Sequence, residues 1–312
     1  MSETPIYKMN YSDGNNSFYI KREDLLPFSF GGNKARKADL FFKEIDSQRN
    51  DCVVTYGSSS SNHCRIIANM AASRKIPCYL ISPVETGKLT VNSQMMELFG
   101  ADIIQCPVIK VNETINAKLN HLKAEGNNPF FIPGGGHGNI GTQAYTYAYR
   151  EISAFEKSTD IHFDYIFHAS GTGTTQAGLI CGMLLQGDTK RIAGISIARK
   201  NPGGGQVVLN SVNEYLGTMD RECADSGIVD FIDDYVLDGY GAYNREILQT
   251  IREVLVDDGI PLDTTYTGKA FWGMKEYIKE NRIMGRNILF IHTGGTPLFY
   301  NNFELICQIE NL

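Results

Sequence analysis

The stretch Tyr165-Ile166-Phe167-His168-Ala169-Ser170-Gly171-Thr172-Gly173-Thr174-Thr175-Gln176 decides the fold class of this chain. Its apolar first half is typical of a buried strand, and its glycine-rich second half opens a helix-like segment. Backbone N–H groups at such a turn, aided by the helix dipole and the hydroxyl groups, form an anion site whose natural ligand is phosphate. A plain turn between a strand and a helix is the alternative interpretation.

Outward from this unit, short apolar runs alternate with longer helix-like segments. The runs lie at 52–56, 78–81, 103–106, 165–167, 192–197 and 288–291, and the helix-like segments at 61–75, 91–99, 112–125, 138–156, 173–186 and 243–258. This alternation predicts an α/β fold with open parallel sheets covered by helices.

Glycine- or serine-rich turns follow strand-like runs at four places, namely 57–62, 134–138, 170–175 and 293–296. In open α/β sheets, ligands bind beyond the carboxyl ends of the strands. Four such turns therefore predict one cleft that is lined from several strands. The turn at 170–176 has no P-loop ending, and Gln176 stands where a dinucleotide fingerprint has its third glycine, which counts against a nicotinamide-dependent dehydrogenase.

Composition excludes several classes of protein. A chain of 312 residues can bury one large core or two smaller ones, and its 42% hydrophobic and 21% charged residues are ordinary for a globular protein. The net charge of −6, without a long basic run, argues against nucleic acid or an anionic membrane as the main partner. The polar, acidic start does not resemble a signal peptide, and no apolar run is long enough to span a bilayer.

Cysteine and histidine spacing favours neither disulfides nor a metal site. The seven cysteines are scattered, odd in number and never spaced as Cys-x-x-Cys, and the six histidines lack a metal-ligand spacing. We therefore expect reduced thiols in a cytoplasmic protein and no bound metal.

Lys34 lies in Phe30-Gly31-Gly32-Asn33-Lys34-Ala35-Arg36-Lys37, just after the strand-like stretch 18–22. Two glycines let the backbone approach another group closely, and Asn33 offers a helix N-cap. A single lysine at the start of the next helix could bind a carbonyl cofactor such as pyridoxal phosphate covalently. The alternative is a glycine turn that caps a basic, solvated helix.

Two further segments suggest substrate contacts. The helix start at Ser61-Asn62-His63 favours an anion such as a substrate carboxylate, although simple N-capping explains Ser61 and Asn62 as well, and the pattern favours a structural role for His63 over that of a base. Tyr266, in a turn that enters a helix, could move a proton if a nearby cation lowered its pKa; a packed aromatic is the alternative.

Together these motifs resemble the pyridoxal-phosphate enzymes of the tryptophan synthase β-subunit fold (fold type II). More narrowly, they are similar to the family of 1-aminocyclopropane-1-carboxylate (ACC) deaminase and D-cysteine desulfhydrase. The matching segments follow the order of that family and lie at 20–25, 31–37, 61–63, 170–178, 238–241, 266–270 and 292–295.

The resemblance implies roles for individual residues. Lys34 would hold the cofactor, Asn62 would bond its ring hydroxyl, and Thr267 would meet its ring nitrogen. The turn formed by Gly171, Thr172, Gly173, Thr174 and Thr175 would bind its phosphate, with added charge from Lys37. Ser61, Tyr240 and Tyr266 would be the catalytic residues around a small amino-acid substrate, and Asn62 and His63 would also contact that substrate.

Two departures from the family pattern bear on the reaction. The deaminase branch carries glutamate at the position of Thr267, and a neutral threonine cannot supply the charge that keeps the ring nitrogen protonated, which favours β-elimination over ring opening. His137 replaces an expected serine, which predicts that it enters the substrate pocket. The segment 292–299 is one residue shorter than in the family pattern, so the sequence does not fix the identity of the substrate.

The predicted function is a lyase for α,β-elimination on a small β-substituted amino acid, similar to D-cysteine desulfhydrase, that releases pyruvate, ammonia and sulfide. Alternatives are an ACC deaminase that forms 2-oxobutyrate, a racemase or β-replacement synthase, and a non-catalytic protein that holds the cofactor. We expect a small domain at 45–152 and a large domain formed by 1–44 and 153–312, with the cofactor cleft between them. The resemblance also implies a homodimer.

Overall fold

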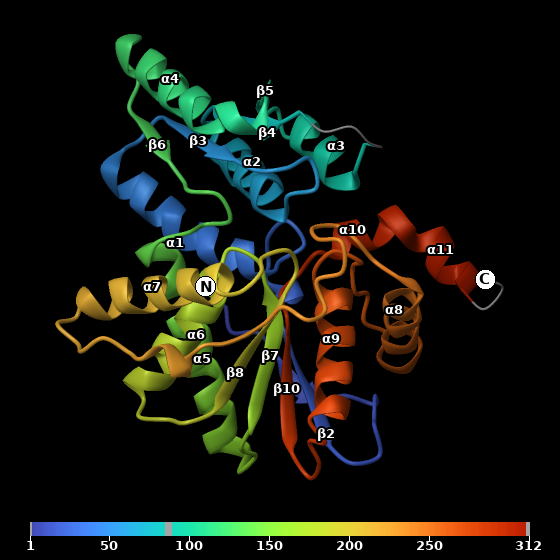
Figure 1. The fold of residues 1–312 in the computed structure, drawn as a ribbon. Coiled ribbons are helices and arrows are strands. Elements are labelled where there is room, and N and C mark those ends of the chain that lie inside the picture. The colour runs from blue at the N-terminus through green and yellow to red at the C-terminus, as the bar shows by residue number, and fades with distance from the viewer. Residues whose placement is uncertain (1, 85–88, 310–312) are drawn as a thin grey trace.

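The chain forms two sheets with helices around them, as predicted (Figure 1). The structure, a computed structural model, describes residues 2–84 and 89–309. The α/β class and the open parallel sheets expected from the sequence are confirmed. No helix among the described residues is long and apolar enough to cross a membrane.

The larger sheet has six strands in the order β1-β2-β10-β7-β8-β9. All neighbours are parallel except β1, which is antiparallel to β2. Their bounds are β1 (Ile6–Lys8), β2 (Ser17–Arg22), β7 (Tyr165–Ser170), β8 (Arg191–Ser196), β9 (Asp230–Ile232) and β10 (Asn287–His292). Phe290 of β10 pairs with Ile20 on one side and Phe167 on the other, so both ends of the chain build this sheet.

The smaller sheet has four parallel strands in the order β5-β4-β3-β6. Their bounds are β3 (Cys52–Tyr56), β4 (Cys78–Pro83), β5 (Asp102–Cys106) and β6 (Pro129–Phe131). This sheet lies in the upper part of Figure 1.

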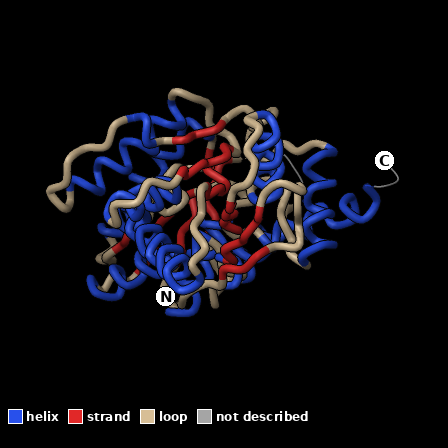
Figure 2. Tube along the Cα trace, turned by 90° about the horizontal axis from the view of Figure 1, so that it is seen from below, coloured by secondary structure: helices blue, strands red, loops and turns tan. Residues whose placement is uncertain are grey.

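Helices cover the sheets, and Figure 2 shows the strands enclosed by helices and loops. The α-helices are α1 (Asn33–Gln48), α2 (Asn62–Arg74), α3 (Val91–Leu98), α4 (Val111–Ala124), α5 (Asn139–Thr159), α6 (Thr174–Leu185), α7 (Gly203–Gly217), α8 (Arg245–Asp258), α9 (Thr267–Glu280), α10 (Thr296–Phe299) and α11 (Phe303–Gln308). Short 3₁₀ helices lie at Glu23–Leu25, Val108–Lys110, Ser226–Ile228 and Tyr300–Asn302.

Strand β10 shows why the central strands are apolar throughout. Side chains alternate between the two faces of a strand. Ile288 and Phe290 enter a core shared with α8 and α9, whereas Leu289 and Ile291 enter a core shared with α5, α6 and α7. Helices on both faces leave no solvent side, which is typical of a parallel sheet.

Helix α1 joins the core of the smaller sheet. Phe41, Phe42 and Ile45 of α1 pack in one cluster with Val53 of β3 and Ile67 of α2. The predicted domain boundaries stay a prediction, but this packing carries Lys34, near the start of α1, to the junction of the two sheets.

Candidate active site

The loop before α1 and the loop after β10 meet backbone to backbone. The N–H of Asn33 donates to the carbonyl of Thr293 at 2.9 Å. A Cβ added at Gly32, whose φ is +95°, would lie 2.7 Å from that same oxygen and 2.9 Å from Cα of Gly294. Only glycine allows this approach, so the crossing of the two loops sets where α1, which carries Lys34, begins.

Asn33 does not cap α1 with its side chain, so that prediction is wrong. Helix α1 begins at Asn33 itself, and Gly32 precedes it without a side-chain cap. The Asn33 amide Nδ2 instead donates to the Thr175 hydroxyl at 3.0 Å. This bond ties the start of α1 to the turn that is predicted to bind phosphate.

The Lys34 amine lies where three loops converge. Its Nζ donates to the carbonyl of Gly135 at 3.0 Å. A Cβ at Gly135 would lie 3.3 Å from that Nζ and 2.7 Å from Cγ2 of Thr172. Burial lowers the pKa of the Lys34 amine from its ordinary value to about 8. A depressed pKa leaves a larger share of the amine unprotonated and nucleophilic at neutral pH.

The start of α6 has the features of a phosphate site. Helix α6 begins at Thr174, and the preceding Gly173, in the left-handed conformation, provides no side-chain cap. Lys37 is 1% exposed, and within residues 2–84 and 89–309 its Nζ has no hydrogen-bond partner. Burial, together with Lys34, lowers the pKa of the Lys37 amine well below its ordinary value, and a bound anion would restore its charge. A buried amine without a hydrogen-bond partner and uncapped N–H groups both favour an anion, so these residues fit the cofactor that the resemblance implies.

His137 contacts this same helix start. Its Nδ1 lies 2.9 Å from the hydroxyl of Thr174. Burial and nearby Lys37 lower the pKa of the imidazole. The structure thus brings His137 to the predicted phosphate end, and its place in the substrate pocket stays a prediction.

The serine and histidine at the start of α2 are tied to local structure. Ser61 is the N-cap of α2 and accepts the N–H of Cys64 at 3.2 Å. His63 is buried, and its Nε2 lies 2.9 Å from the Thr55 hydroxyl of β3. Burial, together with Lys34 and Lys37, lowers the pKa of His63 well below its ordinary value. His63 is therefore a neutral packing residue of α2, in line with its structural interpretation, and its substrate contact stays a prediction.

Two tyrosine hydroxyls meet above the cleft. The hydroxyls of Tyr240 and Tyr266 lie 2.6 Å apart, and that of Tyr240 lies 3.3 Å from Ser60 Oγ and 3.4 Å from Ser58 Oγ. Burial and the Tyr240 hydroxyl raise the pKa of Tyr266 well above its ordinary value, which is opposite to the effect that a nearby cation would have. Tyr266 is therefore a neutral phenol that can donate a hydrogen bond.

Lys269, whose role the sequence did not reveal, holds the loop that carries Tyr240. Its side chain is fully buried, and its Nζ donates to the carbonyls of Val236 at 3.0 Å and Gly239 at 2.8 Å. Burial lowers the pKa of this amine to about 8. Lys269 and Tyr266 both belong to the start of α9, so one helix end fixes both tyrosines.

Two more residues were missed by sequence reasoning, and both contact predicted site residues. Asn92 donates through Nδ2 to Oδ1 of Asn62 at 2.9 Å. The Asp263 carboxylate accepts the hydroxyl of Thr267 at 2.9 Å. Asn92 carries no motif and lies 30 residues from Asn62. Asp263 stands three residues before Tyr266, in the turn that enters α9, where an acidic residue is a recognisable capping signal.

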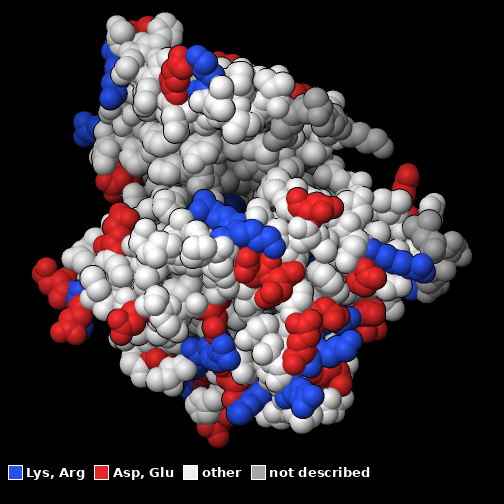
Figure 3. All heavy atoms as spheres, in the orientation of Figure 1, with Lys and Arg blue, Asp and Glu red and all other residues white. Residues whose placement is uncertain are grey.

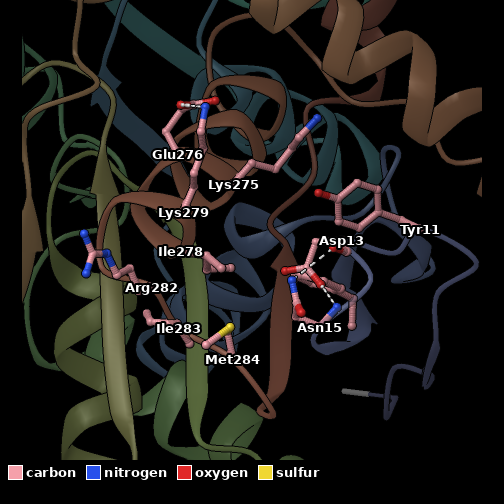
Figure 4. Close-up of a pocket in the computed structure, with 11 residues that line it drawn as sticks. Tyr11, Asp13, Asn15, Lys275, Glu276, Ile278, Lys279, Arg282, Ile283 and Met284 are labelled. Atoms are coloured by element: carbon pink, nitrogen blue, oxygen red, sulfur yellow. Dashed lines mark hydrogen bonds and ion pairs between the residues drawn. The ribbon is translucent and has the colours of Figure 1, made fainter.

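The molecular surface agrees with a cleft at this junction. In Figure 3 the surface is hollowed between the upper and lower halves, and basic side chains gather along its lower edge. A separate groove of about 580 Å³ lies at the other end of the larger sheet (Figure 4). It is lined by residues between Tyr11 and Phe18 and by the end of α9 with the loop that follows, from Lys275 to Met284. None of the predicted site residues lines that groove.

A family model described as "Pyridoxal-phosphate dependent enzyme" matches residues 1–294. The chain belongs to the family of pyridoxal-phosphate-dependent enzymes. Its cofactor is therefore pyridoxal phosphate, for which Lys34, Lys37 and the start of α6 provide suitable groups.

Individual members of the pyridoxal-phosphate family are similar over almost the whole chain. A D-cysteine desulfhydrase of Serratia proteamaculans is 30% identical over 96% of this chain and 93% of that protein. A putative ACC deaminase of Pyrococcus abyssi is 31% identical over 92% of this chain and 87% of that protein. A crystal structure of an ACC deaminase homologue has a TM-score of 0.89 at 30% identity and covers 99% of this chain and 94% of that one.

Proposed function

We propose that the protein catalyses α,β-elimination on a small amino acid with a leaving group at Cβ, with cysteine as the model substrate and pyruvate, ammonia and sulfide as the products. The observation that supports this proposal most strongly is the buried Lys34 amine, which lies among three loops and has its pKa lowered to about 8. The desulfhydrase relatives, which are similar over nearly their full length, support the choice of reaction.

Pyridoxal phosphate, when bound, withdraws electrons from Cα of the substrate. Lys34 would bind the cofactor covalently, while Lys37 and residues 171–175 hold its phosphate. Asn62 and Thr267 would contact its ring oxygen and ring nitrogen. The amine of Lys34, once displaced by substrate, would take the proton from Cα.

Tyr266 would contact the leaving group through its hydroxyl. Its raised pKa keeps the hydroxyl protonated, and the 2.6 Å contact with Tyr240 connects it to a side chain that is 44% exposed. The neutral hydroxyl would donate a hydrogen bond to the departing hydrosulfide, which carries the electron pair of the broken Cβ–S bond, and Tyr240 would hold that hydroxyl in place.

The decisive experiment replaces the predicted cofactor lysine. Lys34→Ala should abolish the absorbance band of covalently bound cofactor and lower keto acid release from D- or L-cysteine by at least about 100-fold. Lys43→Ala is the matched control, because Lys43 is exposed on the same helix. An unchanged band in Lys34→Ala would refute the assignment.

A second candidate function is that of an ACC deaminase, which the relative from Pyrococcus abyssi and the similar crystal structure favour. The two activities differ in their keto acid, since ACC yields 2-oxobutyrate and cysteine yields pyruvate. A screen of D- and L-cysteine, serine, cysteate, diaminopropionate and ACC would separate them. Chiral analysis of recovered substrate would reveal a racemase, and absence of any turnover would indicate a protein that only holds the cofactor.

We also propose a cytoplasmic homodimer. The resemblance to the family supports the dimer. Cysteine usage supports the compartment, since none of the seven cysteines, all within the described residues, takes part in a disulfide. Sedimentation analysis of the purified holoenzyme tests the dimer, and a monomer at micromolar concentration would refute it.

A further inference from the structure

The hydroxyl of Thr267 can only accept a hydrogen bond from a further partner. A threonine hydroxyl has one hydrogen and two lone pairs. Its hydrogen is donated to Oδ1 of Asp263 at 2.9 Å, and one lone pair accepts the N–H of Asp263 at 3.0 Å. One lone pair remains, so any group placed against this oxygen must bring its own proton.

Asp263 keeps the Thr267 hydroxyl an acceptor for any further partner, because hydrogen-bond donors surround the Asp263 carboxylate. The side chain is fully buried, and it accepts the N–H groups of Thr265 at 2.9 Å, Tyr266 at 2.8 Å and Thr267 at 3.0 Å. Burial raises the pKa of this carboxyl, and the backbone donors oppose the rise. Convergent backbone N–H groups favour the ionised form, which has no proton to return to Thr267.

The Asn62 side chain is left as a hydrogen-bond donor, and Asn92 fixes this role. The Nδ2 of Asn92 donates to the carbonyl of Ser60 and to Oδ1 of Asn62, each at 2.9 Å. Because a backbone carbonyl can only accept, the amide of Asn92 cannot turn over. Oδ1 of Asn62 is thereby engaged, and its Nδ2 is left to donate.

The side chains of Asp263 and Asn62 both border Gly295. A Cβ at Gly295 would lie 2.5 Å from Oδ1 of Asp263 and 3.5 Å from Nδ2 of Asn62. One small region thus offers an acceptor on the Thr267 side and a donor on the Asn62 side.

We propose that this arrangement selects one protonation state of the bound pyridoxal ring, with an unprotonated ring oxygen at Asn62 and a protonated ring nitrogen at Thr267. Asp263 and Asn92 act as positioning residues for that selection. The inference rests on the cofactor placement of the proposed function. It revises what the neutral threonine suggested, because the buried carboxylate behind Thr267 supplies the charge that threonine lacks, and a protonated ring withdraws electrons more strongly.

The direct test measures the ring nitrogen itself. The wild-type holoenzyme, loaded with ¹⁵N-labelled pyridoxal phosphate, should show the nitrogen chemical shift of a pyridinium ion across neutral pH. The shift of an unprotonated pyridine would overturn the inference. The proposed function would survive that result if the absorbance band of covalently bound cofactor and keto acid release were intact.

A pair of threonine variants identifies the acceptor. Thr267→Val removes the remaining lone pair and should move the nitrogen shift toward that of unprotonated pyridine. Thr264→Val is the matched control, since this buried hydroxyl of the same turn accepts from Asn302 instead. An unchanged shift in Thr267→Val, or an equal change in both variants, would overturn the role of Thr267.

A double-mutant cycle tests the role of Asn92. Asn92→Ala frees the amide of Asn62 to rotate and should raise the cofactor dissociation constant about tenfold. The same substitution should have almost no effect in an Asn62→Ala background, because Asn92 acts through Asn62. Additive effects of the two substitutions would show that Asn92 does not act in this way.

Discussion

At the scale of single residues, Lys34 links burial to reactivity. Burial lowers the pKa of its amine to about 8, so the amine is mostly unprotonated above that pH and protonated below it. The rate at which apoprotein binds pyridoxal phosphate covalently should therefore rise about tenfold per pH unit below 8 and level off above it. Stopped-flow absorbance across a range of about pH 6 to 10 measures this profile. A rate that still climbs steeply well above the lowered pKa would contradict it.

Sequence reasoning predicts the residues with distinctive neighbours and misses those with distant partners. Lys34, Lys37 and the turn at 171–175 stand in or beside glycine-rich segments that are conspicuous in the sequence, and the structure brings them together. Asn92 could not be found, since its meaning comes from one bond to Asn62 that no local pattern encodes. The structure places His137 against Thr174, a contact that its sequence neighbours do not reveal, and its place in the substrate pocket stays a prediction.

At the scale of elements, the crossing of the loops before α1 and after β10 should tolerate no side chain. Gly32→Ala would meet the backbone of Thr293 in a conformation available only to glycine, so we expect a loss of about 3 kcal/mol or more in unfolding free energy. Urea denaturation measures it.

A second glycine separates the backbone effect from the clash. Gly14 has a similar φ of +80°, but a Cβ there meets nothing within 4 Å. Gly14→Ala should therefore cost only about 1 to 2 kcal/mol. Equal losses in Gly32→Ala and Gly14→Ala would mean that the close approach of the two loops is not what demands glycine.

Regular elements are predictable where the chain shows its periodicity over several consecutive residues. The run at 52–56 is strand β3 residue for residue, and 173–186 is close to α6. Strands β1, β6 and β9 have three residues each, too few for an alternating pattern to be seen. Helix α7 opens with three glycines, which disfavour helix; packing explains the second of them, since a Cβ at Gly204 would lie 2.2 Å from the ring of Phe231.

At the scale of the whole molecule, a buried ion network joins the N-terminal segment of the chain to helix α5. Glu23 accepts from Arg36 at 2.5 Å, and Glu151 of α5 bonds both Arg36 at 2.6 Å and Lys21 of β2 at 2.5 Å. Burial by itself would raise the pKa of the Glu23 carboxyl, but Arg36 and Lys21 outweigh it and hold the pKa at about 2. The network fixes α1, and hence Lys34, against the larger sheet.

Removal of one charge from this network should be costly and dependent on pH. Glu23→Gln leaves two buried cations, Arg36 and Lys21, to share the single carboxylate of Glu151, and we expect a loss of about 3 to 5 kcal/mol at neutral pH. Because the pKa of Glu23 is depressed in the folded state, its contribution is complete above its ordinary value and is lost as the pH falls toward about 2. The difference between wild type and variant in urea denaturation should therefore shrink as the pH is lowered below about 5.

An exposed pair provides the comparison. Glu253 contacts Lys275 with half of its side chain in solvent, so Glu253→Gln should change the unfolding free energy by less than about 1 kcal/mol. A Glu23→Gln variant as stable as Glu253→Gln would show that the buried network does not stabilise the fold.

The close backbone contact between Gly32 and Gly294 affects how this fold can evolve. The place of the cofactor lysine depends on main-chain atoms, which every substitution elsewhere leaves intact. The loops that bear His137 and Tyr240 are separate from that crossing. We therefore expect substitutions at His137 and Tyr240, which are predicted to contact the substrate, to change substrate preference while the main-chain crossing that positions α1 stays in place.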